Sequence, residues 1–477
     1  MLFNSIDFIF FFLIVTTLYF ILPHRWRWFL LLASSCYFYM FFVPIYILIL
    51  AFTIIIDYFA GLFIEKRTGH SRKLFLVMSL VANIGVLAYF KYFNFLNQNL
   101  TFLLEKFDLR NPLPFLKILL PIGLSFHTFQ AMSYTIEVYR GKQKAERHFG
   151  IYALYVMFYP QLVAGPIERP QNMLPQFYHK KEFNYAHVAE GLKLIVWGFY
   201  KKVVVADRIA IYVNPIYNSP LHQSGLTLLV ATIMFAFQIY CDFSGYSDIA
   251  LGTAKVMGFN LMINFRRPYF SKTVSEFWRR WHISLSKWFT DYLYISLGGN
   301  RVSIPRWYLN LFITFLISGL WHGANWTFVL WGALNGIYLI LTTILQDPLD
   351  SIIKKLGLTR FPRLIQYFQM ILTFMLINIA WIFFRANNIS DAFLIVKKIC
   401  HPSGPLFYDN NPSVIIYPCI AIALLMVAEW NIEFNQKLMV NLKEKPWLFK
   451  CIIYALIVAI ILIMGVFDGG QFIYFQF

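Results

Sequence analysis

The chain has 477 residues, of which 59% are hydrophobic and 13% are charged, with 41 Lys and Arg against 23 Asp and Glu. Because soluble globular proteins carry about 25% charged residues, this composition excludes a water-soluble body of the same size. It predicts an all-α polytopic membrane protein, since helices satisfy their own backbone polar groups in lipid. The net charge of +18 fits basic loops that face anionic lipid, so membrane lipid is an expected partner and nucleic acid is not.

Apolar runs along the chain predict about eleven transmembrane helices, some of them re-entrant or interfacial, because one membrane crossing needs about 20 apolar residues. The runs lie at roughly 7–22, 28–42, 44–64, 74–95, 115–138, 149–163, 188–213, 225–250, 307–346, 364–384, 412–430 and 448–467. Several are short or joined. No repeat or low-complexity linker divides them, so the sequence predicts a single membrane domain over residues 1–477.

Loop charges predict the orientation of these helices. Basic loops at Arg25–Arg27, Lys66–Lys73 and Arg140–His148 alternate with an uncharged bend near Pro44. Because basic loops are retained in the cytoplasm, this alternation places Met1 outside. The same counting places the carboxy-terminus outside.

His322 lies inside the stretch Trp307–Gln346, which has no Asp, Glu, Lys or Arg and is about two spans long. Around it runs Ser318-Gly319-Leu320-Trp321-His322-Gly323-Ala324-Asn325-Trp326. Glycine permits close helix approach or a break, and irregular backbone at membrane depth normally lines a cavity. Imidazole there favours a proton-transfer site. The alternative is a neutral histidine bonded to a backbone carbonyl, and the residues alone leave both open.

His282 lies in Thr273–Thr290, a predicted amphipathic helix that opens with a capping box of Thr273 and Glu276. Its apolar face would carry Val274, Phe277, Trp278, Trp281, Leu285 and Trp288, and its polar face Ser275, Arg279, His282 and Ser286. Such a helix is typical of the membrane interface. Alternatively, its polar face lines a channel and binds the phosphate of an anionic donor.

Other polar residues predict less. The polar neighbours of His127 indicate a hydrogen-bonded helix contact. Asp242 and Asp248 do not share a helix face, so they predict no metal pair, although either could orient a histidine or pair with an arginine. We expect no metal site, because the chain has no C-x-x-C or H-E-x-x-H motif, and no ATP-driven transport, because it has no Walker A motif.

Six segments together carry a family resemblance. The chain resembles the membrane-bound O-acyltransferases, in the bacterial branch that includes alginate O-acetylase. The resembling segments are Val163-Ala164-Gly165-Pro166-Ile167, Asp242-Phe243-Ser244-Gly245-Tyr246-Ser247-Asp248, Phe277-Trp278-Arg279-Arg280-Trp281-His282-Ile283-Ser284-Leu285, Asp291-Tyr292-Leu293-Tyr294-Ile295-Ser296-Leu297-Gly298-Gly299-Asn300-Arg301, Ser318-Gly319-Leu320-Trp321-His322-Gly323 and Phe383-Phe384-Arg385-Ala386.

The resemblance implies helices around a through-membrane tunnel in the bacterial cytoplasmic (inner) membrane. It implies that His322 is the catalytic histidine and His282 the second characteristic one. The donor would be a cytoplasmic thioester, acetyl-CoA or an acyl carrier protein, with no bound cofactor. We expect donor contacts from Arg279, Arg280, Trp321 and Asn325. The acyl group would pass to an extracytoplasmic SGNH/esterase-like acyltransferase partner for O-acylation of a cell-surface polysaccharide.

The final six residues, Phe472-Ile473-Tyr474-Phe475-Gln476-Phe477, resemble the F-x-Y-F-x-F tail of the alginate-type branch. In that resemblance Tyr474 carries the acyl group, which is chemically reasonable because a phenol ester is a good leaving group. The alternative is that these aromatic residues anchor the tail at the membrane interface.

Two other functions stay open on the residues alone. A multi-pass transporter or flippase could use His322 and His282 as a proton or substrate relay, although no inverted repeat is visible. A non-catalytic scaffold for a periplasmic transferase is the second. The acceptor polymer, the acyl group and the donor are not determined by the sequence.

Overall fold

The computed structural model describes residues 1–117, 121–163, 165–406, 411–435, 437, 444–467 and 473. Throughout these ranges the regular structure is helical and no strand occurs, which confirms the predicted all-α class. The chain has two compact units, residues 1–195 with 247–262 and residues 196–246 with 263–477. Each unit is described by itself. The predicted single domain over 1–477 stays a prediction.

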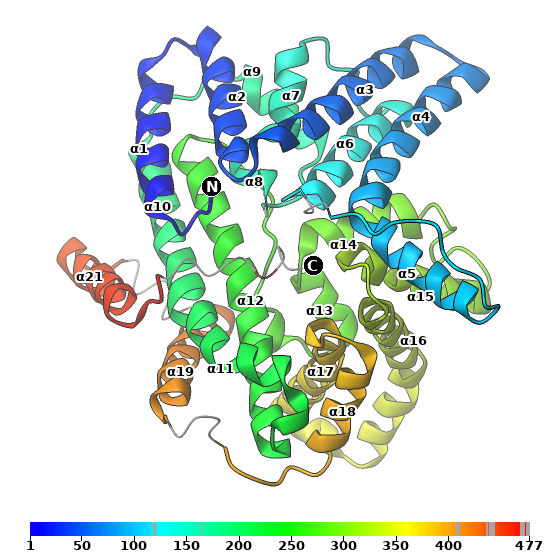
Figure 1. Ribbon diagram of the computed structural model, residues 1–477. Helices are drawn as coiled ribbons and strands as arrows, with labels where there is room; N and C mark the ends of the chain where they lie inside the picture. Colours follow the sequence, from blue (N-terminus) through cyan, green and yellow to red (C-terminus); the bar gives the residue numbers. More distant parts are fainter. Residues whose placement is uncertain are drawn as a thin grey trace. The chain divides into compact units, whose positions relative to one another are not determined.

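The first unit is built from short and long helices of the amino-terminal half. They are α1 (Ile6–Ile21), α2 (His24–Met40), α3 (Ile47–Lys66), α4 (Gly69–Leu87), α5 (Phe93–Glu105), α6 (Leu124–Tyr139), α7 (Phe149–Met157), α8 (Tyr159–Leu162), α9 (Pro170–Tyr178) and most of α10 (Tyr185–Phe199). Figure 1 shows α3, α4 and α6 packed side by side. This trio forms the polar centre of the unit.

A buried carboxylate joins the helices of that trio. Ser79 Oγ donates to Asp57 Oδ1 over 2.6 Å, and Asn83 Nδ2 donates to Asp57 Oδ1 and Oδ2 over 3.0 and 2.8 Å. Ser79 Oγ also lies 3.0 Å from Thr135 Oγ1. Because an unpartnered buried charge is costly, these contacts fix the order of α3, α4 and α6.

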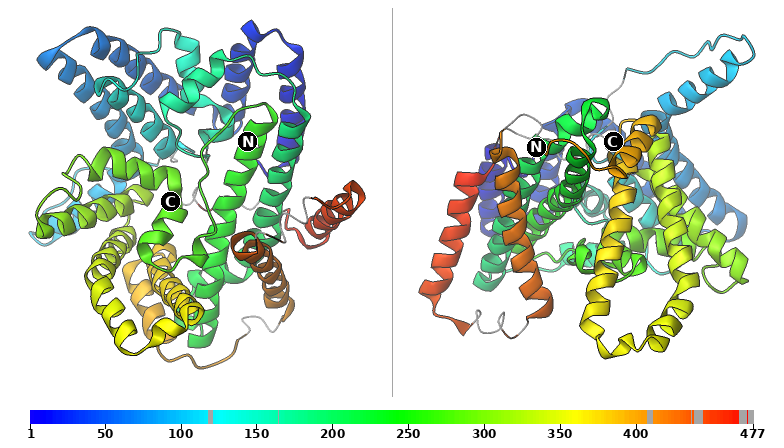
Figure 2. Two further views of the ribbon diagram at one scale, coloured as in Figure 1. Left: turned by 180° about the vertical axis from the view of Figure 1, so that it is seen from behind. Right: turned by 90° about the horizontal axis from the view of Figure 1, so that it is seen from below.

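The second unit holds the remaining helices. They are α11 (Asp207–Asn218), the first part of α12 (Gly225–Val256), α13 (Val274–Arg280), α14 (Ile283–Phe289), α15 (Ile304–His322), α16 (Trp326–Lys355), α17 (Pro362–Arg385), α18 (Ile389–Ile399), α19 (Ser413–Phe434) and α21 (Trp447–Met464). Helices α15 and α16 form a hairpin, and α17 runs beside α16 (Figure 2). Three tryptophans of the second unit, each 1% exposed, lie in its hydrophobic core: Trp281, Trp331 and Trp381.

Within the described ranges, seven helices are long and apolar enough to cross a membrane. They span Pro44–Lys66, Gly69–Glu105, Gly225–Val256, Trp326–Lys355, Pro362–Arg385, Ser413–Phe434 and Trp447–Met464. The chain is therefore a multi-pass membrane protein, but the predicted count of about eleven is not confirmed. Some predicted spans fold as shorter pieces. For example, the run 149–163 divides into α7 and α8 at Phe158, just before Pro160.

Candidate functional site

The uncharged stretch around His322 breaks where its sequence predicts. Helix α15 ends at His322, Gly323 is extended, and α16 begins at Trp326. Asn325 caps the second helix, because its Oδ1 accepts the Thr327 N–H over 3.0 Å. One apolar run thus becomes a helical hairpin with the histidine at its turn.

Two glycines bring the arms of this hairpin into backbone contact. A Cβ on Gly319 would overlap the Phe328 carbonyl of α16, and a Cβ on Gly332 would overlap the Phe315 carbonyl of α15. Small residues allow such close approach in membrane helices. The contact lies one turn before His322 and fixes where α15 ends relative to α16.

Aromatic rings surround the His322 imidazole. The ring centroids of Trp321, Trp331 and Phe384 lie 4.9, 5.0 and 5.3 Å from that of His322. The residue is 5% exposed. A ring held this firmly by packing can present one nitrogen to a substrate in a fixed direction.

The predicted helix Thr273–Thr290 is wrong as one continuous element. The structure has α13 over Val274–Arg280 and α14 over Ile283–Phe289, and His282 between them takes a left-handed conformation with φ 42°. Two main-chain bonds hold the break: Arg266 N–H donates to Arg280 O and Ile283 N–H to Asn264 O, both over 2.9 Å. These tertiary contacts override the helical periodicity of the sequence. One half of the predicted capping box is confirmed, since Thr273 Oγ1 accepts the Glu276 N–H, whereas Glu276 Oε2 accepts from the main-chain N–H of Lys272 and not from that of Thr273.

The break turns His282 inward, away from the polar face predicted for it. The side chain is 1% exposed, and its ring lies edge-on to Phe243 with centroids 4.6 Å apart. Its ring centroid is also 6.3 Å from that of Trp321, so Trp321 packs near both histidines. Burial lowers the pKa of His282 to about 3, so its imidazole is neutral at physiological pH.

Both histidines line one cavity of about 320 Å³. Hydroxyl groups line it as well, from Ser275, Ser286, Thr290, Thr314 and Ser318. Two cations, Arg279 and Lys287, contribute to the lining and are exposed. A proton acceptor, hydrogen-bonding groups and exposed positive charge in one concave site are what an anionic acyl donor requires.

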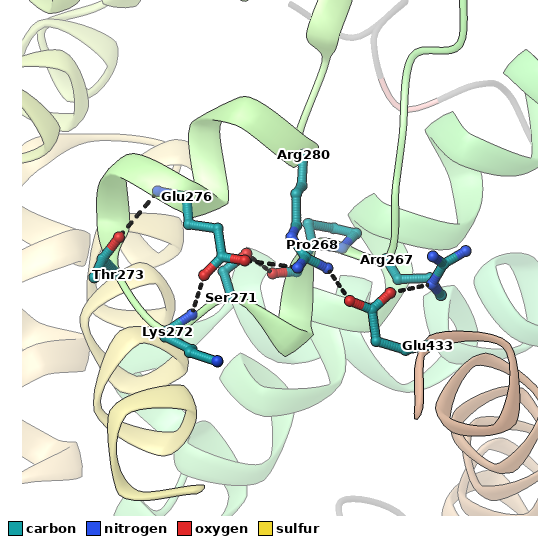
Figure 3. A network of polar contacts seen from close by, with 8 residues as sticks. All are labelled: Arg267, Pro268, Ser271, Lys272, Thr273, Glu276, Arg280 and Glu433. Atoms are coloured by element: carbon teal, nitrogen blue, oxygen red, sulfur yellow. Dashed lines mark hydrogen bonds and ion pairs between the residues drawn. The ribbon is translucent and has the colours of Figure 1, made fainter. Parts of the chain in front are cut away.

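The other residues predicted to contact the donor have structural partners. Arg280 donates to Glu433 Oε1 over 2.8 Å and to Glu276 Oε1 over 2.6 Å. Figure 3 shows the Glu433 carboxylate between Arg280 and Arg267, whose Nε lies 2.7 Å from Glu433 Oε2. This network ties α13 to the end of α19. Trp321 is buried and packs on His322, and Asn325 caps α16.

Two other predicted residues, His127 and Asp242, do not line the cavity. His127, in the first unit, has its Nδ1 3.2 Å from the carbonyl of Gly123, the N-cap of the same helix, so the expected contact between two helices stays a prediction. Asp242 pairs with a lysine rather than with a histidine or arginine: Lys202 Nζ lies 2.6 Å from its Oδ1. Ala164 and Tyr474 lie outside the described residues.

Comparison with known proteins identifies the family to which the chain is similar. Residues 148–386 match the model of the membrane-bound O-acyltransferase family. A probable alginate O-acetylase from Pseudomonas aeruginosa is 40% identical over 402 residues, 84% of this chain and 75% of that protein. A peptidoglycan O-acetyltransferase from Helicobacter pylori is 36% identical over 441 residues, 85% of this chain and 80% of that protein.

The chain belongs to the membrane-bound O-acyltransferase family.

Its relatives place it in the branch of the family that resembles alginate O-acetylase. A teichoic acid D-alanyltransferase from Streptococcus thermophilus is more distant, at 29% identity over 261 residues, 50% of this chain and 62% of that protein. The protein is therefore an acyltransferase, which selects one of the functions that the residues alone left open. Both cavity histidines fall inside the matched range 148–386.

Sequence reasoning missed several residues of this candidate site. Lys287 lines the cavity, but its single charge in an aromatic-rich segment gave no signal beyond basic character. Asn264 holds the break at His282, since its Oδ1 also accepts from Ser284 Oγ over 2.6 Å. Phe384 packs on His322, although Phe383-Phe384-Arg385-Ala386 entered only as a resembling segment. The last two contacts join residues distant in sequence, which one chain alone cannot reveal.

Proposed function

We propose that this protein is an O-acetyltransferase that takes an acyl group from a cytoplasmic thioester and moves it across the bacterial inner membrane. The donor is acetyl-CoA or an acyl carrier protein, and the acceptor is a hydroxyl of a cell-surface polysaccharide. The observation that carries the proposal is the shared cavity, in which His322 and His282 lie with exposed Arg279 and Lys287. Relatives named for O-acetylation of alginate and peptidoglycan support an acetyl group and a polymeric acceptor.

In the proposed reaction, His322 acts as the general base. It removes the proton from an attacking hydroxyl, whose oxygen forms a C–O bond to the thioester carbonyl carbon. The C–S bond then breaks, and the leaving thiolate takes the proton back from the imidazolium. Neutral His282 lines the same cavity and can hydrogen-bond the thioester or the attacking oxygen. No metal enters this scheme.

Tyr474 is the proposed first acceptor. Its phenol oxygen would take the acyl group in the step above, which forms an aryl ester. A polymer hydroxyl would then attack that ester, directly or through an SGNH/esterase-like partner, and regenerate the phenol. The sequence supports this assignment through the F-x-Y-F-x-F ending of the chain.

The decisive test replaces the proposed base. The variant His322→Ala should lower polymer acetylation by about 10²- to 10⁴-fold, the usual contribution of a general base. Acetyl content of surface polymer is measured by mass spectrometry in cells that lack or carry the protein. His127→Gln is the matched control, because His127 is buried elsewhere and bonded to Gly123 O.

Loss of acetylation counts as evidence only if the variants are folded. Both variants must purify as folded, monodisperse protein in equal yield. Wild-type acetylation by His322→Ala would refute the assigned base. An acyl adduct on Tyr474 that disappears in His322→Ala would support the relay, whereas turnover without any adduct would support interfacial anchoring of the tail.

A further inference from the structure

A buried ion cluster in the second unit receives the carboxy-terminal segment. Lys202 Nζ lies 2.6 Å from Asp242 Oδ1 and 2.8 Å from Asp207 Oδ1. The second oxygen of Asp242 accepts the main-chain N–H of Ile473 over 2.6 Å. All three charged residues are buried, with exposed fractions of 1% for Lys202, 3% for Asp242 and 7% for Asp207.

Met464 and Val466, which precede Ile473 in the sequence, are hydrogen-bonded to the elements that carry this cluster. Met464, the last residue of α21, accepts a hydrogen bond from Arg208 Nε over 3.1 Å. Val466 N–H donates to Val203 O over 3.0 Å. Val203 and Lys202 both belong to the π-helical turn η3 (Tyr200–Ala206), a form of helix that is enriched at functional sites. The Ile473 side chain is 4% exposed, within the core of the unit.

The form of the contact determines what it can do. An ion pair buried at this depth is weak evidence for stability, because desolvation offsets the attraction between the charges. Its best-attested use is to fix one arrangement among several. Asp242 accepts a hydrogen bond from the main-chain N–H of Ile473, so it holds Ile473 beside the ion cluster.

The same stretch of α12 also contacts one of the two cavity histidines. Phe243 follows Asp242 in the chain, and its ring packs 4.6 Å from that of His282. His282 in turn lines the cavity with His322. Two consecutive residues of α12 therefore contact the carboxy-terminal segment and a cavity histidine. Tyr474 follows Ile473 directly in the sequence.

We propose that Lys202, Asp207 and Asp242 form a positioning site that holds the carboxy-terminal segment at residue 473 and so delivers residue 474 to the acyl-transfer cavity. Asp242 is the contact residue, and Lys202 orients its carboxylate. The role of residue 474 rests on the proposed function, whereas the docking of residue 473 does not.

The test measures docking and transfer separately. Hydrogen exchange of the full-length protein in nanodiscs reports the Ile473 amide, and intact mass reports the acyl adduct on Tyr474. Asp242→Asn should speed exchange at Ile473 by about tenfold or more, since the charge-assisted bond is lost. The adduct should form at least tenfold more slowly, while KM for the thioester stays unchanged, because the donor cavity is intact.

A second variant and a control make the result decisive. Ile473→Pro removes the N–H and leaves the three buried charges in place, so it should slow adduct formation at least tenfold, as Asp242→Asn does. It therefore tests the proposal even if Asp242→Asn folds poorly. Glu168→Gln is the control, because Glu168 is also buried and accepts a main-chain N–H, but from Met262 within the first unit. It should leave Ile473 exchange and adduct formation unchanged.

Unchanged exchange at Ile473 in Asp242→Asn, or wild-type adduct formation in Ile473→Pro, would overturn the positioning site. Failure of the proposed relay looks different. In that case wild-type protein turns over with no adduct on Tyr474, and Tyr474→Phe retains acetylation, while the exchange difference at Ile473 persists.

Discussion

At the residue scale, the positive charges near the cavity separate into two kinds. Arg279 and Lys287 are exposed and line the cavity, whereas Arg280 is engaged by Glu276 and Glu433. Neighbouring arginines in one motif thus have different tasks. An exposed cation can meet a phosphate of the donor, while a cation in a carboxylate network holds helices together.

We therefore expect Lys287→Ala and Arg279→Ala each to raise KM for the thioester donor by about tenfold, the equivalent of one charge-assisted hydrogen bond. Their kcat should change little. Arg280→Ala should instead lower the melting temperature of the purified protein, because it removes the ion pairs of Arg280 with Glu276 and Glu433. Steady-state kinetics and thermal unfolding in detergent distinguish the two effects. Equal KM changes in all three variants would contradict the assignment of Arg279 and Lys287 to donor binding and of Arg280 to helix packing.

At the element scale, the hairpin of α15 and α16 depends on the absence of side chains at two positions. A Cβ at Gly319 or Gly332 would meet backbone atoms of the opposite helix, which cannot move aside as a side chain can. The tip of this hairpin is where His322 lies. The hairpin therefore couples helix packing to the geometry of the site.

Gly319→Ala and Gly332→Ala should each destabilise the protein by about 1–3 kcal/mol through overpacking. They should also reduce acetylation, since His322 shifts with the helix end. Gly85→Ala is the matched control in α4, where no atom lies within 4 Å of the added Cβ. It should stabilise slightly, because alanine is the better helix former. Melting temperatures of the three variants check this order, and a stable Gly319→Ala protein would refute it.

At the scale of the whole molecule, the orientation of the helices in the membrane is predicted from the charges of the loops. Seven helices of the described chain can cross a membrane, and basic loops predict which ends face the cytoplasm. Lys142 lies in a basic loop and Ile45 in the uncharged bend, and both side chains are exposed. Lys142 is therefore expected on the cytoplasmic side of the membrane and Ile45 on the opposite side.

In a cysteine-free background, Ile45→Cys should react with a membrane-impermeant maleimide on intact cells whose outer barrier is open. Lys142→Cys should react after the inner membrane is permeabilised and not before. The background is needed because Cys400, Cys419 and Cys451 are exposed thiols. Labelling in the reverse pattern would contradict the predicted topology.

The sequence predicted what depends on local composition and missed what depends on tertiary contact. The all-α class and the break at His322 follow from apolar runs and glycines. The inward turn of His282 could not be predicted, because its cause is Asn264 and Arg266, held through main-chain bonds to residues 283 and 280. The Lys202–Asp242 pair was missed for the same reason, since its partners lie 40 positions apart.

The backbone contact between α15 and α16 also constrains motion. With no side chain between the helices at Gly319 and Gly332, neither helix can slide along the other without a clash. His322 is three residues beyond Gly319, so its ring moves with the hairpin as one body. We therefore expect a stationary imidazole throughout the reaction cycle. The thioester and the attacking hydroxyl must then both be brought to it, and their arrival and departure set the pace of turnover.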